Sequence, residues 1–95
     1  MSDLFWTPGA LQDRNAIYNH IEKTNPLAAL ALDELFVAKA QRLIAYPALG
    51  RPGRVPGTRE LVVSRHYILI YALVDETVCV VRVLHSARRW PLRTR

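Results

Sequence analysis

The chain is poor in several residue types and segments, and each shortage excludes a class of protein. Its 95 residues contain one cysteine, Cys79, so no disulfide can form within the chain and a reducing compartment is expected. No apolar run reaches the ~18 residues that span a bilayer. The N-terminus carries the acidic Asp3 and lacks the basic stretch of a signal peptide. The sequence therefore predicts a cytoplasmic protein without a membrane segment.

Motifs for metal, nucleotide and nucleophilic chemistry are also missing. The histidines His20, His66 and His85 have no ligand-like spacing, and Cys79 has no second thiol to pair with on a metal. The chain contains no phosphate loop of the GxxxxGK[ST] kind and no serine in a nucleophile elbow. We therefore expect no metal and no cofactor.

Acidic side chains are scarce in the second half of the chain. Residues 1–49 hold four basic and five acidic side chains, whereas residues 50–95 hold nine arginines against Glu60, Asp75 and Glu76. The formal net charge of +5 is thus concentrated in residues 50–95. This asymmetry favours an anionic partner, either nucleic acid or an acidic protein segment, over a basic surface that only confers solubility.

The length and a hydrophobic fraction of 51% fit a single domain, residues 1–95, with one core. Two proline-led segments predict helices, because Thr7 and Asn25 are typical N-caps and each precedes a proline suited to the first helical position. The second helix is expected over residues 26–46, and a connection this short forces an antiparallel hairpin. The side chains expected on the buried sides are Leu11, Ile17, Tyr18 and Ile21 in the first helix, and Ala28, Ala31, Leu32, Leu35, Phe36, Leu43 and Ile44 in the second.

Strand-length apolar runs predict a sheet. Residues 4–7 suit an edge strand, residues 48–58 are a Gly/Pro-rich loop, and residues 59–64, 67–74 and 77–84 are three strands joined by tight turns. The last two runs are apolar on both faces, which predicts central positions. The expected fold class is α+β, in the order β-α-α-β-β-β, with an antiparallel-rich sheet and a helical hairpin packed on one face.

Two polar residues in the final strand are the strongest candidates for chemistry. Arg82 stands among valines, so it must find an anion, either an internal carboxylate such as Glu60 or a ligand in a cleft. His85 ends the strand, where it could serve as a general acid or base, contact a phosphate, or simply cap or stack. Alternation places Val78, Val80, Arg82 and Leu84 on one face and His85 on the other, so a bulge or strand end would be needed to join Arg82 and His85.

Three motifs in order carry a family resemblance that extends over nearly the whole chain. PGTRELV at 56–62, YILIY at 67–71 and RVLHSARRWP at 82–91 resemble the RelE/ParE superfamily of bacterial type II toxins. The segment FWTPGALQDRNAIYNHIEKTNP at 5–26 is similar to the first strand and helical hairpin of that superfamily. The resemblance implies a cytosolic toxin that is neutralised by a cognate antitoxin with an acidic or amphipathic segment, and a complex that binds operator DNA mainly through the antitoxin.

The superfamily has two activities, and the resemblance implies candidate residues for each. The RelE branch is an endoribonuclease that cuts mRNA on the ribosome, for which the candidate catalytic residues here are Arg59, Arg82 and His85. Ser86 stands where such nucleases have a catalytic tyrosine, and serine is a poor acid or base. The ParE branch poisons DNA gyrase by protein–protein contact.

VPGTRELV together with HSARRWP is closer to ParE-type members, so gyrase inhibition is favoured over RNA cleavage, and a member that has lost toxicity is a third alternative. For either target we expect an anion- or partner-binding surface of guanidinium groups on a stiff sheet. Its candidate residues are Arg51, Arg54, Arg59, Arg88, Arg89 and Trp90.

Overall fold

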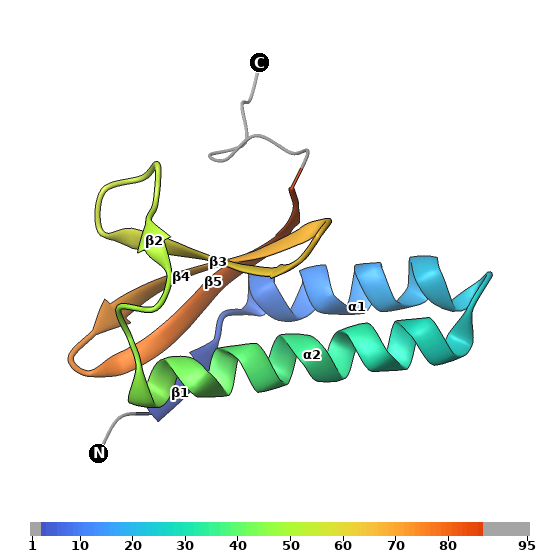
Figure 1. Cartoon of the computed structure of the whole chain (residues 1–95), viewed down its shortest axis with the longest axis horizontal. Helices are drawn as coiled ribbons and strands as arrows, with labels where there is room; N and C mark the ends of the chain where they lie inside the picture. Colours follow the sequence, from blue (N-terminus) through green and yellow to red (C-terminus); the bar gives the residue numbers. More distant parts are fainter. Residues whose placement is uncertain (1–2, 87–95) are drawn as a thin grey trace.

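The computed structural model describes residues 3–86, which form two layers, a helical hairpin and an open five-stranded sheet (Figure 1). The strands are β1 (Asp3–Trp6), β2 (Arg51–Pro52), β3 (Thr58–Ser64), β4 (Tyr67–Val74) and β5 (Thr77–His85), in the order β1-β5-β4-β3-β2. β1 runs parallel to β5, and the other neighbouring pairs are antiparallel. The predicted α+β class is confirmed, with β1 at the expected edge and β4 at the centre.

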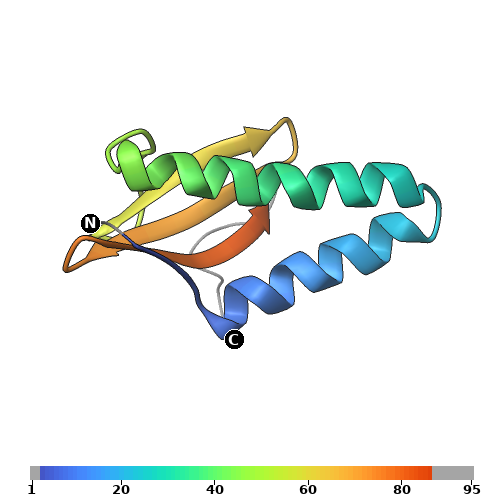
Figure 2. The same cartoon turned by 90° about the horizontal axis from the view of Figure 1, so that it is seen from below.

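The helices α1 (Pro8–Glu22) and α2 (Pro26–Ala45) begin where their capping residues place them. The side-chain oxygens of Thr7 and Asn25 accept hydrogen bonds from the backbone N–H groups of Ala10 and Ala28, each at 3.1 Å, so both predicted N-caps are confirmed. Figure 2 shows that both helices cover the same face of the sheet. Neither of these two helices combines the length and apolar character needed to cross a membrane.

The buried sides of the helices agree with the predicted ones in part: Phe36 and Leu43 are fully buried, and Ile17, Leu32 and Leu35 pack against the core, as expected. Ala10 is fully buried in α1, whereas Leu11 is 49% exposed, and in α2 Ala31 is exposed. The residues of α2 in the core are Ala29, Phe36, Ala40 and Leu43. Ala10, Ala29 and Ala40 also occupy the core, because a small side chain lets a helix approach its neighbours closely, and the prediction missed these three alanines.

The predicted loop 48–58 contains the short strand β2, which the sequence did not reveal. β2 pairs with β3 and is anchored by Tyr71, a fully buried side chain of β4. The Tyr71 hydroxyl accepts a hydrogen bond from the N–H of Gly50 at 2.9 Å and donates one to the carbonyl of Pro47 at 2.7 Å. The start of the loop is thereby fixed to the centre of the sheet.

A bulge in β5 changes which side chains share a face. Tyr71 pairs with Val80 and Ile70 pairs with Arg82, so Val81 is the extra residue. Val78, Val80 and Val83 therefore face the helices, whereas Leu84 packs with Ile68 and Ile70 in a second buried cluster on the opposite face of the sheet. The strict alternation expected from the sequence is wrong here, because one inserted residue reverses the side-chain order beyond it.

Candidate functional site

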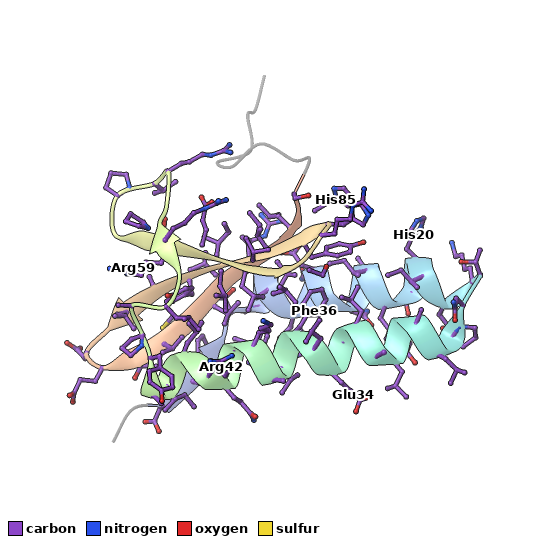
Figure 3. All side chains as sticks on the ribbon, viewed as in Figure 1. His20, Glu34, Phe36, Arg42, Arg59 and His85 are labelled. Carbon is purple, nitrogen blue, oxygen red and sulfur yellow. The ribbon has the colours of Figure 1, made fainter. Side chains whose placement is uncertain are left out.

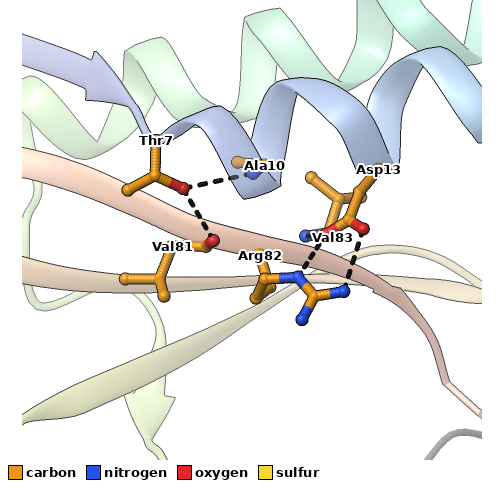
Figure 4. A network of polar contacts seen from close by, with 6 residues as sticks. All are labelled: Thr7, Ala10, Asp13, Val81, Arg82 and Val83. Carbon is orange, nitrogen blue, oxygen red and sulfur yellow. Dashed lines mark hydrogen bonds and ion pairs between the residues drawn. The ribbon is translucent and has the colours of Figure 1, made fainter.

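The second half of β5 lies beyond the end of β1, and α1 takes the place of a neighbouring strand there. β1 ends at Trp6, which pairs with Val80. The backbone N–H and hydroxyl of Thr7 then donate to the carbonyls of Val80 at 3.0 Å and Val81 at 2.8 Å. The N–H of Val83 donates to Oδ2 of Asp13 at 2.9 Å (Figure 4). The backbone and hydroxyl of Thr7 and the side chain of Asp13 thus satisfy backbone groups that would otherwise form an open sheet edge.

The same carboxylate holds Arg82. Nε and Nη2 of Arg82 donate to the two oxygens of Asp13 at 2.7 and 3.0 Å, in the bidentate geometry that a guanidinium favours (Figure 4). The hydrogen bonding of Arg82 to Asp13 raises the pKa of the Arg82 guanidinium above its usual range, against the opposing effect of burial, and the negative charge of Asp13 adds to the rise. Arg82 therefore pairs with an internal carboxylate, but the partner is Asp13 and the expectation of Glu60 is wrong.

Glu60 belongs instead to the arginine-rich loop. Its side chain is 4% exposed, and Oε1 accepts hydrogen bonds from Arg51 at 3.1 and 3.4 Å. Oε2 accepts from the backbone N–H of Arg54 at 3.3 Å, which leaves the exposed Arg54 side chain outside this contact. Nη1 of Arg59 donates to the carbonyl of Gly50 at 2.6 Å. One buried carboxylate and one guanidinium thus hold the loop, while Arg51 and Arg54 remain at the surface.

His85 stands at the opposite end of the sheet, in an aromatic cluster. Its ring stacks on that of His66 at a centroid distance of 5.4 Å and meets the Tyr67 ring edge-on at 5.3 Å. Tyr67 in turn contacts Phe36 of α2 edge-on. His85 also lines a cleft of about 240 Å³ between α1 and β5, together with His20. The stacking role that the sequence left open for His85 is therefore present.

The three candidate catalytic residues do not converge. Arg59 pairs with Tyr71 and His85 with Tyr67, so they are four residues apart along β4, or about 13 Å at the usual rise of a strand. Figure 3 shows Arg59 and His85 at opposite ends of the sheet. Arg82 pairs with Ile70, and the Ile70 side chain lies on the face of the sheet opposite to that of Tyr71 and Tyr67. Each candidate has a separate environment and its own contacts.

Some site residues lie outside the prediction or outside the described chain. Arg88, Arg89 and Trp90 fall outside the described residues. Asp13 and His20 were not among the predicted site residues, because only the parallel pairing of the first strand with the last brings α1 beside β5. No signal within either segment reveals that contact. Within residues 3–86, no group of three or more His, Cys, Asp or Glu side chains is arranged to hold a metal ion.

Comparison with known proteins gives consistent matches over this whole fold. A family model described as the ParE toxin of type II toxin-antitoxin system, parDE, matches residues 4–90. Toxin RelE2 of Caulobacter vibrioides is 38% identical over 88 residues, which cover 93% of this chain and 99% of that protein. Y4kP of Sinorhizobium fredii, which is also named as a toxin, is 36% identical over 86 residues, or 90% of each chain.

Solved structures agree with the sequence matches. A chain from the chromosomal ParDE TA system of P. aeruginosa superposes with a TM-score of 0.80 at 29% identity, covering 90% of this chain and 96% of that one. YafQ from E. coli strain BL21(DE3) has a TM-score of 0.55 at 23% identity over 92% of this chain and 96% of its own, which shows a shared fold.

Proposed function

Because the chain belongs to the ParE toxin family and is the toxin component of a type II toxin–antitoxin system, we propose that it arrests bacterial growth by poisoning DNA gyrase. The observation that carries this proposal is the match of the ParE family model to residues 4–90, which include both helices and all strands described here except the first residue of β1. The P. aeruginosa ParDE chain supports it, with the higher identity and TM-score of the two solved structures compared.

The geometry of the arginines and His85 also favours a target bound by surface contact. RNA cleavage needs charge-stabilising groups and an acid–base pair around one phosphate. Here Arg82 is held by Asp13, Arg59 by the carbonyl of Gly50, and His85 lies at the far end of β4 from Arg59. Gyrase poisoning by protein–protein contact requires no such convergence.

Ribosome-dependent RNA cleavage is the second candidate function. It is favoured by the name of the Caulobacter relative, toxin RelE2, and by the exposed position of His85 beside a cleft. On this alternative Arg59, Arg82 and His85 would have to be brought together by rearrangement on the ribosome.

The neutralising partner belongs to the same proposal. Solved proteins of this fold include the YoeB-YefM complex of Staphylococcus aureus and the DinJ-YafQ complex of E. coli. We propose that a cognate antitoxin, encoded beside this protein, binds it, and that operator DNA is bound through the complex of the two proteins. Arg54 is exposed in the loop after β2, which Figure 1 shows projecting from the sheet away from the helices, and the exposed Arg51 lies in β2 itself. An acidic segment can reach both side chains.

Parallel assays of the two activities test the proposal. Purified protein at micromolar excess should block gyrase supercoiling or trap cleaved DNA, and prior mixing with the antitoxin should abolish the effect. The same preparation should leave mRNA on programmed ribosomes intact. No effect on gyrase, together with mRNA cleavage that falls at least about 10²-fold in His85→Gln, would replace gyrase poisoning with the nuclease alternative.

A further inference from the structure

The side of the helical hairpin that faces away from the sheet carries exposed apolar side chains. Figures 1 and 2 show the two helices as an outer layer, with the sheet on one side of them. Leu11 of α1 is 49% exposed, and Leu27 and Leu30 of α2 are 80% and 48% exposed. Tyr18 follows Leu11 by about two helical turns, so it lies on the same side of α1. We call these four residues the outer hairpin face.

An ion pair between the two helices fixes which residues of this face lie level with one another. Nε and Nη2 of Arg14 donate to the two carboxylate oxygens of Asp33 at 3.0 and 2.8 Å. Because the helices run antiparallel, Leu30, three residues before Asp33, lies level with the residues three or four after Arg14, and so with Tyr18.

A hollow of about 230 Å³ opens beside this ion pair. It is lined by Leu11, Arg14, Asn15, Tyr18 and Asp33. Its volume is below the usual range of small-molecule sites, and its two charged side chains neutralise each other. An uncharged side chain from another protein surface is therefore the occupant that suits it.

The distribution of charge favours a second copy of this chain as the source of that surface. Residues 1–49 hold four basic and five acidic side chains, so two hairpins can meet with little repulsion. The basic strands would then lie about 10 Å further back on each side, beyond the Debye length of about 8 Å at physiological salt. An acidic partner gains no attraction from this nearly neutral layer and is drawn to residues 50–95 instead.

We propose that two copies of this protein associate through their outer hairpin faces, about a two-fold axis that runs along the hairpin. Such an axis keeps each residue at its own level, so it places α2 of one copy over α1 of the other. Leu30 of each copy then meets Tyr18 of the other beside the hollow, and the same contact is made twice. All neighbouring helices in the resulting four-helix layer run antiparallel, which brings opposite ends of the helix dipoles together.

The size of the face predicts a weak dimer. α1 has 15 residues, or about 22 Å of helix, and packed helices lie about 8–10 Å apart. Two hairpins in contact would therefore bury about 800–1,000 Å² in total, which is the size of a transient interface. We expect a dissociation constant on the order of 10 μM. The loop after β2 stays accessible in both copies, because it projects from the sheet away from the helices (Figure 1).

Sedimentation equilibrium of the full-length protein alone tests the proposal. Between about 1 and 200 μM, the average mass should rise from that of the monomer towards twice that value, with a midpoint at about 10 μM. Leu30→Glu should weaken the association by at least about tenfold, because it buries an unpaired charge against an apolar neighbour. Added salt should not weaken the association, since the contact is uncharged and salt screens the repulsion between the basic strands.

Val62→Glu is the matched control, because Val62 is 51% exposed but pairs with Ile68 on the opposite face of the sheet. It should leave the association unchanged, and circular dichroism should confirm that both variants are folded. A wild-type protein that stays monomeric at about 200 μM, or two folded variants that lose association equally, would overturn the proposal. A monomer whose affinity for the antitoxin falls in Leu30→Glu would overturn it in favour of the antitoxin as the occupant of this face. The measurement contains no gyrase, so its failure and that of gyrase poisoning are separately visible.

Discussion

At the scale of single residues, Asp13 combines two roles, one for a side chain and one for the backbone of β5. Its carboxylate accepts three hydrogen bonds, two from the guanidinium of Arg82 and one from the backbone of Val83. The first two neutralise a charge that β5 places among apolar residues, and the third satisfies a sheet edge that has no strand beside it. Removing the carboxylate would leave both a half-buried cation and a backbone donor without their partner.

We therefore expect Asp13→Ala to lower the free energy of unfolding by about 2–3 kcal/mol, the range for hydrogen bonds to charged groups. Because the pKa of Arg82 is raised, the stability linked to its proton is fully present below the usual arginine range and is lost only as the pH rises through the raised value. Titration of Arg82 should thus make no contribution to the pH dependence of stability between pH 6 and 9. Urea unfolding measures both effects.

Glu34→Ala is the control for Asp13→Ala, since it removes an exposed carboxylate from α2 and should change stability by less than about 0.5 kcal/mol. A double-mutant cycle with Arg82→Met should show a favourable coupling between Asp13 and Arg82. Additive losses in that cycle would show that the bidentate contact contributes nothing to folding.

At the scale of elements, the strand β2 depends on the close approach of Gly50 to the sheet. A Cβ atom at Gly50 would lie 2.7 Å from Cε1 of Tyr71 and 2.9 Å from the carbonyl oxygen of Glu60. Neither neighbour can move easily, because the Tyr71 ring is fully buried and the carbonyl belongs to β3. A glycine at this position is what lets the loop lie against Tyr71.

Gly50→Ala should destabilise the fold by about 1–3 kcal/mol, the usual cost of forcing extra atoms into a packed site. Gly9→Ala is the matched control, because its Cβ would meet the Arg82 side chain at an ordinary 3.5 Å and alanine suits a helix better than glycine. It should leave stability unchanged or slightly increased. Thermal unfolding compares the two variants, and equal melting temperatures would show that the loop can move away from Tyr71 without cost.

The elements that the sequence predicts well are those determined by neighbouring residues. Thr7 and Asn25 cap the helices through atoms three residues away, and the β4–β5 turn needs only Asp75 and Glu76 in the left-handed region. The bulge at Val81 and the pairing of Arg82 were not predictable, because both depend on α1 lying beside β5. These contacts join residues about seventy positions apart, which no local pattern encodes.

In the candidate site, too, the unusual residues could be predicted from the sequence, whereas the distant residues that contact them could not. The sequence marked Arg82 and His85 as unusual, and both have specific contacts in the structure. It could not supply their neighbours, Asp13 for the arginine and His66 and His20 for the histidine, since the fold brings these together from three separate elements.

At the scale of the whole molecule, positive charge and helices are separated. The two helices lie in the nearly neutral residues 1–49, and the strands β2 to β5 lie in the basic residues 50–95. Arg54, in the loop between β2 and β3, uses its backbone rather than its side chain to bond Glu60, and its side chain is exposed. Such a charge accelerates the encounter with an acidic partner more than it strengthens the final complex.

Reversal of one charge at each of two positions tests whether the placement of charge matters or only its total. Arg54→Glu should slow association with the cognate antitoxin by roughly threefold at low salt and flatten the salt dependence of the association rate, as expected when steering is weakened. Arg42→Glu on the exposed side of α2 changes the net charge equally and should leave the rate near that of the wild type. Stopped-flow mixing at two ionic strengths provides the measurement. Equal slowing by both variants would mean that only the net charge of the protein steers its partner, because the position of each arginine on the fold would then have no influence on the encounter.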